Sequence, residues 1–170
     1  MTHLEKTADT AMTTDIGRIL ESAPVTASAP CRIDVGGTLD IASLYYPLAH
    51  LAPCTFNVAL DLRTHVRIEP YRAGCIRVVS KGFEPAEFSL DEAPFSHDLG
   101  LIFAVAACFR MDGIQIHISS SSPPRSALGG SSVAALALVA AFSRLQKALG
   151  KPALSRTDMV LFAHGIEQAI

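Results

Sequence analysis

One stretch of the chain combines glycines, serines and prolines in a pattern that can bind an anion. Pro123 to Ala135 reads PPRSALGGSSVAA; it follows a β-prone segment and leads into an alanine-rich apolar run. A strand, a Gly/Ser loop and a helix in succession expose several backbone N–H groups at the positive end of the helix dipole. This order of elements predicts an anion-binding site.

The individual residues of the loop support two explanations. Gly129 and Gly130 would let the backbone approach a phosphate, and the hydroxyls of Ser126, Ser131 and Ser132 could donate to phosphate oxygens or coordinate Mg²⁺. A plain helix N-cap explains the serines equally well, because serine is common at helix starts. The loop has neither the Lys-Ser or Lys-Thr pair of a P-loop nor the GxGxxG pattern of a dinucleotide site. From physics alone, the phosphate site and the cap both stay open.

The elements that must position this loop form an α+β pattern, with mostly antiparallel strands and helices packed on one side. The segments 54–71 and 75–80 are both expected as antiparallel strands, because they are rich in β-branched residues and alternate in part. Further strands are expected at 25–35, 83–88 and 114–119, and helices at 15–22, 38–50, 95–111, from the loop to 149, and from 155 onward.

The two helices that end the chain carry the clearest local signals. Apolar residues recur at helical spacing from Leu138 to Leu149, and Gly150 follows as a stop signal. Ser155 and Asp158 form a Ser-x-x-Asp cap that predicts the start of the last helix. The loop should therefore lead into a long, core-facing helix that a second helix follows.

Composition limits the class of protein. A chain of 170 residues with 49% hydrophobic and 18% charged residues fits one globular domain. We expect an irregular leader at 1–24 and the domain at 25–170. The 14 basic and 16 acidic side chains are scattered, so no nucleic-acid partner is expected. The longest apolar runs are too short for a membrane span, and no secretion signal is visible; a cytoplasmic location is the expectation.

The four cysteines do not indicate a metal site or a disulfide framework. Cys31, Cys54, Cys75 and Cys108 stand more than twenty residues apart and form no CxxC pair. We expect them to be buried free thiols.

Three segments in order give the chain a resemblance to the GHMP kinases, the family of galactokinase, homoserine kinase and mevalonate kinase. APCRIDVGGTLD, residues 29–40, is similar to the first motif of the family, a strand and glycine turn that end in an aspartate. The loop described above is similar to the phosphate loop, and FAHGIEQAI, residues 162–170, resembles the helix with the magnesium-binding glutamate. The resemblance implies the GHMP kinase N-terminal fold, which is like domain 2 of ribosomal protein S5.

The resemblance implies ATP and Mg²⁺ as cofactors and phosphoryl transfer from ATP to a hydroxyl of a sugar or related metabolite. Arg32 would sit near the transferred phosphoryl group as the catalytic residue, and Asp34 and Asp40 would bind the substrate. Ser131 and Glu167 would hold Mg²⁺. The residues implied to bind ATP are Pro124, Ser126, Leu128, Gly129, Gly130, Ser131 and Ser132.

Each implied role has a structural alternative. Asp40 could cap the following helix, Arg32 could form a structural ion pair, and Glu167 could be a solvated helix residue. Ala127 stands where the family has its first glycine, and Arg125 is unusual at its position. The first motif is also one residue shorter than the usual sugar-kinase form.

The chain is about half the length of a GHMP kinase. The family's catalytic aspartate and C-terminal domain lie beyond the matching segments, so we expect a fragment that is inactive by itself. The alternative is a non-catalytic nucleotide- or sugar-binding module of the same fold. A face normally covered by the second domain would be apolar, which predicts a homodimer through that face.

Overall fold

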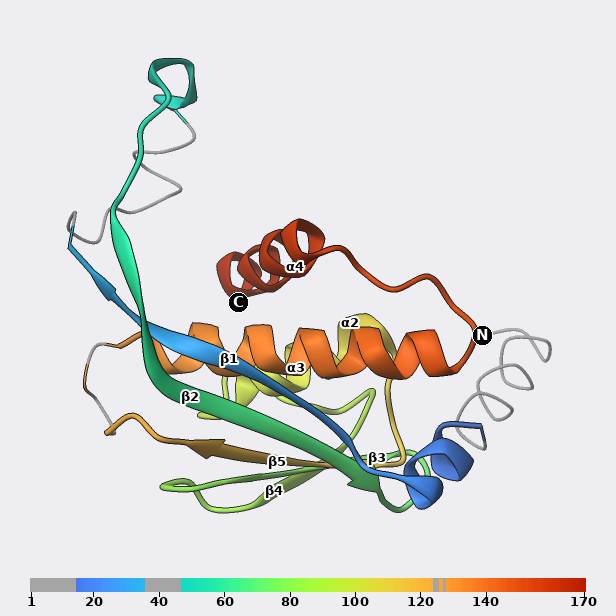
Figure 1. The fold of residues 1–170 in the computed structure, drawn as a ribbon. Helices are drawn as coiled ribbons and strands as arrows, with labels where there is room; N and C mark the ends of the chain where they lie inside the picture. The colour runs from blue at the N-terminus through green and yellow to red at the C-terminus, as the bar shows by residue number, and fades with distance from the viewer. Residues whose placement is uncertain (1–14, 36–46, 124–125, 127) are drawn as a thin grey trace.

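The computed structural model describes residues 15–35, 47–123, 126 and 128–170 (Figure 1). A five-stranded sheet lies on one side of the molecule, and helices α2, α3 and α4 lie on the other. The elements, in chain order, are β1 Val25–Asp34, the 3-10 turn η2 Ala49–Leu51, β2 Asn57–Pro70, β3 Cys75–Ser80, β4 Ala86–Ser89, α2 Gly100–Phe109, β5 Ile114–Ser120, α3 Gly130–Ala148 and α4 Arg156–Ala169.

The sheet has the strand order β1-β2-β5-β3-β4. Three of its four pairings are antiparallel, and β3 pairs with β5 in parallel. This confirms the α+β class with a mostly antiparallel sheet. The expectation for 75–80 is correct for only one of its neighbours, because β3 is antiparallel to β4 and parallel to β5. The following strand is shorter than the expected 83–88 and begins at Ala86.

Side chains alternate between the two faces of the sheet, and the inner face forms the core. In β5, Ile114 and Ile116 are fully buried, as the alternation predicted, and Val66 and Ile68 of β2 lie beside them. Helix α3 packs on this face against β1 and β2. Its stripe from Leu138 to Leu145 is buried, so the predicted core face of this helix is confirmed.

The apolar helix α2 is shorter than the expected 95–111. It begins at Gly100, where a Cβ atom would lie 1.9 Å from the carbonyl oxygen of Phe95. The preceding segment is therefore folded tightly against the helix start. The tight approach requires glycine at position 100, because any side chain there would displace backbone atoms.

The N-terminal segment differs in part from its expectation. Residues 15–22 are helical, in agreement with the short helix expected there. Ile16 and Leu20 are 0% and 2% exposed and belong to the main core. These residues are therefore part of the packed domain and not of an irregular leader, because two turns of an amphipathic helix suffice to bury one apolar face.

The helix expected at 38–50 lies mostly outside the described residues, which resume at 47 with a turn and η2. In the described part of the chain, no helix has the length and apolar character to cross a membrane. The same residues contain no group of three or more His, Cys, Asp or Glu side chains arranged to hold a metal ion.

Candidate functional site

The site begins where the Gly/Ser loop becomes helix α3. Gly129 has a φ of 75°, a left-handed conformation that glycine adopts without strain, and α3 starts at the next residue. Gly129 has no side chain to cap the first amides, and the first turn of α3 contains no acidic residue. A Cβ atom on Gly130 would have nothing within 4 Å. The positive end of a 19-residue helix is thus presented at an open backbone.

A hydroxyl network fixes the strand that leads into the loop. Thr64 of β2 is 1% exposed, and its hydroxyl donates to Ser120 Oγ at 3.0 Å. The backbone N–H of Ser122 donates to the same oxygen at 3.2 Å. The end of β5 is therefore tied to β2 just before the loop begins.

The predicted catalytic residue Arg32 reaches this helix start from β1. The pairing of β1 with β2 changes register between Pro30 and Arg32, an irregularity of the kind that redirects a side chain. A Cβ atom on Gly129 would lie 2.9 Å from Arg32 Nη1, so the guanidinium lies directly against this glycine. Two residues 97 positions apart thus bring a full positive charge and a helix N-terminus to one place.

Arg32 is held in this position by the neighbouring strand. Its Nε–H donates to Asn57 Oδ1 at 3.2 Å. Asn57 is the first residue of β2, and its own Nδ2 donates to Thr55 Oγ1. Asn57 lies opposite Asp34 in the ladder, so the predicted substrate residue Asp34 is adjacent to this group.

Glu167 of α4 also contacts the first turn of α3. Ser132 Oγ donates to Glu167 Oε1 at 2.7 Å, which joins the first turn of α3 to α4. Both side chains are half-buried, whereas Ser131 is exposed. The structure therefore shows a contact of Glu167 with Ser132, the neighbour of the Ser131 that the family resemblance implied. Consecutive helical residues point about 100° apart, so only one of the two can face α4.

The other predicted residues divide into two groups. Ser126 is exposed, and Leu128 is half-buried and packs against the core. Asp40, Pro124, Arg125 and Ala127 lie outside the described residues. Among the described residues, sequence reasoning missed Asn57 and Thr55. One signal pointed to Asn57: it is the only asparagine in the chain and stands at the start of a β-branched strand, where asparagine is disfavoured.

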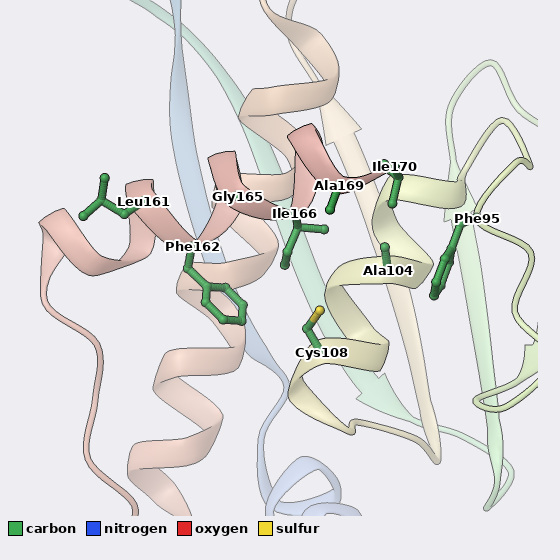
Figure 2. Close-up of a pocket in the computed structure, with 9 residues that line it drawn as sticks. All are labelled: Phe95, Ala104, Cys108, Leu161, Phe162, Gly165, Ile166, Ala169 and Ile170. Carbon is green, nitrogen blue, oxygen red and sulfur yellow. The ribbon is translucent and has the colours of Figure 1, made fainter. Parts of the chain in front are cut away.

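An apolar groove lies between α2 and the outer face of α4 (Figure 2). Its volume is about 410 Å³, and Leu161, Phe162 and Ile170 expose 61%, 37% and 53% of their surface there. Figure 2 shows the sulfur of Cys108 directed toward this groove. The expectation of buried thiols is thus correct for Cys31 only, because Cys54 and Cys108 are exposed and Cys75 is half-buried. Helix α4 packs against both α3 and α2, and these apolar side chains remain exposed beside the contacts.

The comparisons with known proteins cover the segment that contains the loop. Residues 99–170, which include the loop, α3 and α4, match the family of the GHMP kinases N terminal domain. The mevalonate kinase of Thermococcus onnurineus (strain NA1) is 30% identical over 160 residues, which are 84% of this chain and 44% of that protein.

The fold is shared with solved kinases. A structure of Lactococcus lactis galactokinase complexed with galactose matches 94% of this chain and 42% of its own, with a TM-score of 0.68 and 16% identity. A D-glycero-D-manno-heptose 1-phosphate kinase from Bacteriodes thetaiotaomicron matches 86% of this chain and 48% of its own, with a TM-score of 0.58 and 16% identity.

Residues 99–170 therefore match the GHMP kinase N-terminal domain family, and the chain shares its fold with solved kinases. It spans less than half the length of the curated relative and of these two solved kinases.

Proposed function

We propose that this domain is the ATP-binding half of a small-molecule kinase that transfers the γ-phosphoryl group of ATP to a hydroxyl group. The observation that supports this most directly is the convergence of Arg32 and the N-terminus of α3 at Gly129. Two positive groups held side by side repel each other, and an anion between them would relieve that repulsion. The triphosphate of ATP, the cofactor that the family resemblance implies, is the anion that we propose here.

The loop and the first turn of α3 would bind the phosphates of ATP. The backbone amides after Gly129 are oriented along the helix axis toward the loop, and Arg32 would contact the transferred phosphoryl group. The remaining contacts would come from the loop positions Pro124, Ser126, Leu128, Gly129, Gly130 and Ser131, as the family resemblance implies.

A divalent cation fits the residues on the α4 side. Ser132 Oγ and Glu167 Oε1 are both oxygen donors and lie 2.7 Å apart, and Mg²⁺ prefers oxygen ligands. We propose Glu167 as the metal-binding carboxylate, with Ser131 as the implied hydroxyl and Ser132 as the hydroxyl that the structure places beside it. The ion, when bound, would neutralise negative charge on the phosphates.

We propose a sugar or a related alcohol as the acceptor. This rests on the glycine turn of the first motif, which resembles that of heptose and fucose kinases, with Asp34 and Asp40 as the residues that would bind hydroxyl groups. The relationship to a mevalonate kinase makes mevalonate the second acceptor to test. Because the chain is expected to be inactive by itself, the test is calorimetric binding of each acceptor in the presence of Mg·ATP; binding of mevalonate but of no sugar would overturn the sugar assignment.

The alternative function is a non-catalytic nucleotide- or sugar-binding module. Ala127 favours it, because a methyl group at the family's first loop glycine restricts the backbone conformations available for phosphate contact. Ala127→Gly distinguishes the two: a loop impaired by the methyl group should bind Mg·ATP more tightly after this change, whereas an unimpaired loop should not.

Calorimetric titration with Mg·ATP tests the phosphate site. We expect binding by the wild type and weaker binding by Ser132→Ala, with a smaller effect of Ser131→Ala because only Ser132 contacts Glu167. Ser22→Ala is the matched control, since Ser22 is an exposed serine on the helix at the opposite end of α3 (Figure 1). A wild type that binds no Mg·ATP would remove the support for this function.

We propose further that the groove between α2 and α4 is covered by a second copy of the chain. The groove presents several exposed apolar side chains on one helix face, and such patches are usually buried in an interface. Sedimentation of the wild type and of Leu161→Asp tests this: the wild type should dimerise with rising concentration and the variant should not. A wild type that stays monomeric at high concentration contradicts the dimer.

A further inference from the structure

We propose that Asn57 is a positioning residue that aims Arg32 at the anion site, with Thr55 as the second hydrogen-bond partner of the Asn57 amide. This inference rests on the proposed function, because it assumes that Arg32 contacts a phosphate. No motif of the sequence includes Thr55 or Asn57, and they enter only through their contacts in the structure.

The hydrogen bonds run in one direction, from Arg32 through Asn57 to Thr55. The Nε–H of Arg32 donates to Asn57 Oδ1 at 3.2 Å, and because this group can only donate, it determines which end of the amide faces the arginine. Asn57 Nδ2 in turn donates to Thr55 Oγ1, which gives the amide a second contact. If the amide were reversed, its NH₂ group would face the guanidinium, and two donors would meet.

The atom that Asn57 engages determines what the rest of the guanidinium can do. The group is planar, so a hydrogen bond at Nε sets the direction of both Nη atoms. Nη1 then lies against Gly129 at the start of α3. The Nη donors are the part of arginine that binds a phosphate in a bidentate manner. Asn57 therefore holds the side of Arg32 that faces away from the proposed ligand.

The electrostatics of the site explain why Arg32 needs such a contact. Arg32 is an exposed, long side chain, and the positive end of α3 repels it when no anion is present. Its partner in β2 is a neutral amide, which orients the guanidinium without neutralising it. A carboxylate at this position would hold Arg32 as firmly but would compete with the phosphate for its charge. The neutral partner thus preorganises the site for an anion.

The first test compares the binding of Mg·ATP to three variants by calorimetry. Asn57→Leu keeps the size of the side chain and removes the acceptor, and we expect it to weaken binding about five- to tenfold. Thr55→Val, which changes only the second contact, should weaken binding less, and Thr55→Ser should restore it because the hydroxyl is kept. Gln115→Leu is the matched control, since it removes an amide from β5 that contacts His117 and not Arg32.

A double-mutant cycle separates positioning from a structural role. In the Arg32→Ala background, Asn57→Leu should have no further effect on Mg·ATP binding, because the group it positions is gone. If Asn57→Leu weakens Mg·ATP binding by the same factor in both backgrounds, Asn57 does not act through Arg32 and the inference is overturned. Thermal unfolding of each variant identifies any that no longer fold, and Thr55→Val then carries the comparison.

A second readout does not depend on ATP. The Nε–H resonance of Arg32, assigned by its loss in Arg32→Lys, should shift and exchange faster with solvent in Asn57→Leu than in Gln115→Leu. An unchanged resonance overturns the inference even if ATP binds. A shifted resonance in a protein that binds no Mg·ATP would instead contradict the proposed function and leave the contact between Asn57 and Arg32 established.

Discussion

Two arginines of the sheet region, Arg67 and Arg72, have the opposite kind of partner from Arg32, which lies on β1 beside the start of α3. On β2, Arg67 pairs with Glu69, with Nε and Oε1 2.8 Å apart, and His117 Nε2 lies 3.1 Å from the other oxygen of Glu69. At the edge of the sheet, Arg72 pairs with Glu87. Arg32, in contrast, is hydrogen-bonded to the neutral amide of Asn57.

Both carboxylates have a lowered pKa because of their hydrogen-bond partners. The hydrogen bond from Arg67 is the main cause that lowers the pKa of Glu69, with the nearby charges of Arg67 and His117 adding to it. The hydrogen bond from Tyr71, at 2.6 Å, is the main cause that lowers the pKa of Glu87. The charges of these two pairs are thus balanced within the protein, whereas the described contact of Arg32 orients its guanidinium without neutralising it.

The largest expected effect is on ligand binding. Arg32→Ala should weaken Mg·ATP binding by about tenfold to a hundredfold, because a hydrogen bond to a charged group contributes about 1.5–3 kcal/mol. Arg67→Ala should leave binding unchanged. Calorimetry on the two variants makes the comparison, and an equal loss in both would show that Arg32 acts only through the net charge of the protein.

The second largest expected effect is on stability, at the glycine that Arg32 contacts. Gly129→Ala should lower the free energy of unfolding by about 1–2 kcal/mol, because its φ of 75° disfavours any side chain. It should also displace the guanidinium, whose Nη1 would lie 2.9 Å from the new Cβ.

Gly130→Ala is the matched control for that substitution. A Cβ atom there would have nothing within 4 Å, so stability should stay within about 0.5 kcal/mol of the wild type. Urea unfolding measures both variants. Equal destabilisation would mean that the conformation of Gly129 is not what distinguishes the two positions.

The smallest expected effect is on how the stability of the protein depends on pH through Glu69. A carboxylate with a lowered pKa in the folded state stabilises the fold at neutral pH, and this contribution is lost as the pH falls through that lowered value. Glu69→Gln should therefore unfold in urea with a weaker dependence on acid than the wild type.

Glu84→Gln is the control for this comparison, because Glu84 is an exposed carboxylate outside the strands. Its urea midpoint should follow the wild type from neutral to acidic pH. If Glu69→Gln also follows the wild type throughout, the pair with Arg67 does not contribute to the stability of the sheet.

Some features of the fold could be predicted from local patterns. The alternation in β5, the apolar stripe of α3 and the cap at Ser155 were all confirmed, and the Ser155 hydroxyl accepts from the N–H of Asp158 at 3.1 Å. Each of these signals lies within a few residues, where the periodicity of the backbone relates side chains directly. The parallel pairing of β3 with β5 could not be predicted, because a strand with apolar residues on one face fits either direction.

The candidate site was predicted only in part, because some of its contacts join residues that are far apart in the chain. The loop and Arg32 were recognised from their motifs, but the preference for Ser132 over Ser131 depends on how α4 packs against α3. The contact between Arg32 and Asn57 depends on the register of two strands whose paired residues are 23 or more positions apart. Neither packing nor register is encoded by any short segment alone.

The sequence by itself determined the class of fold, the long helix after the loop and the residue types that could bind a phosphate, because these follow from periodicity and from the chemistry of neighbouring residues. The tertiary structure decided which serine meets Glu167, which face of α4 remains uncovered and where Arg32 points. These outcomes depend on the packing of α4 and on the pairing of β1 with β2, which bring together residues that are far apart in the chain. The Gly/Ser loop supplies an open helix end, and the strand pairing brings to it the charge that makes it a candidate phosphate site.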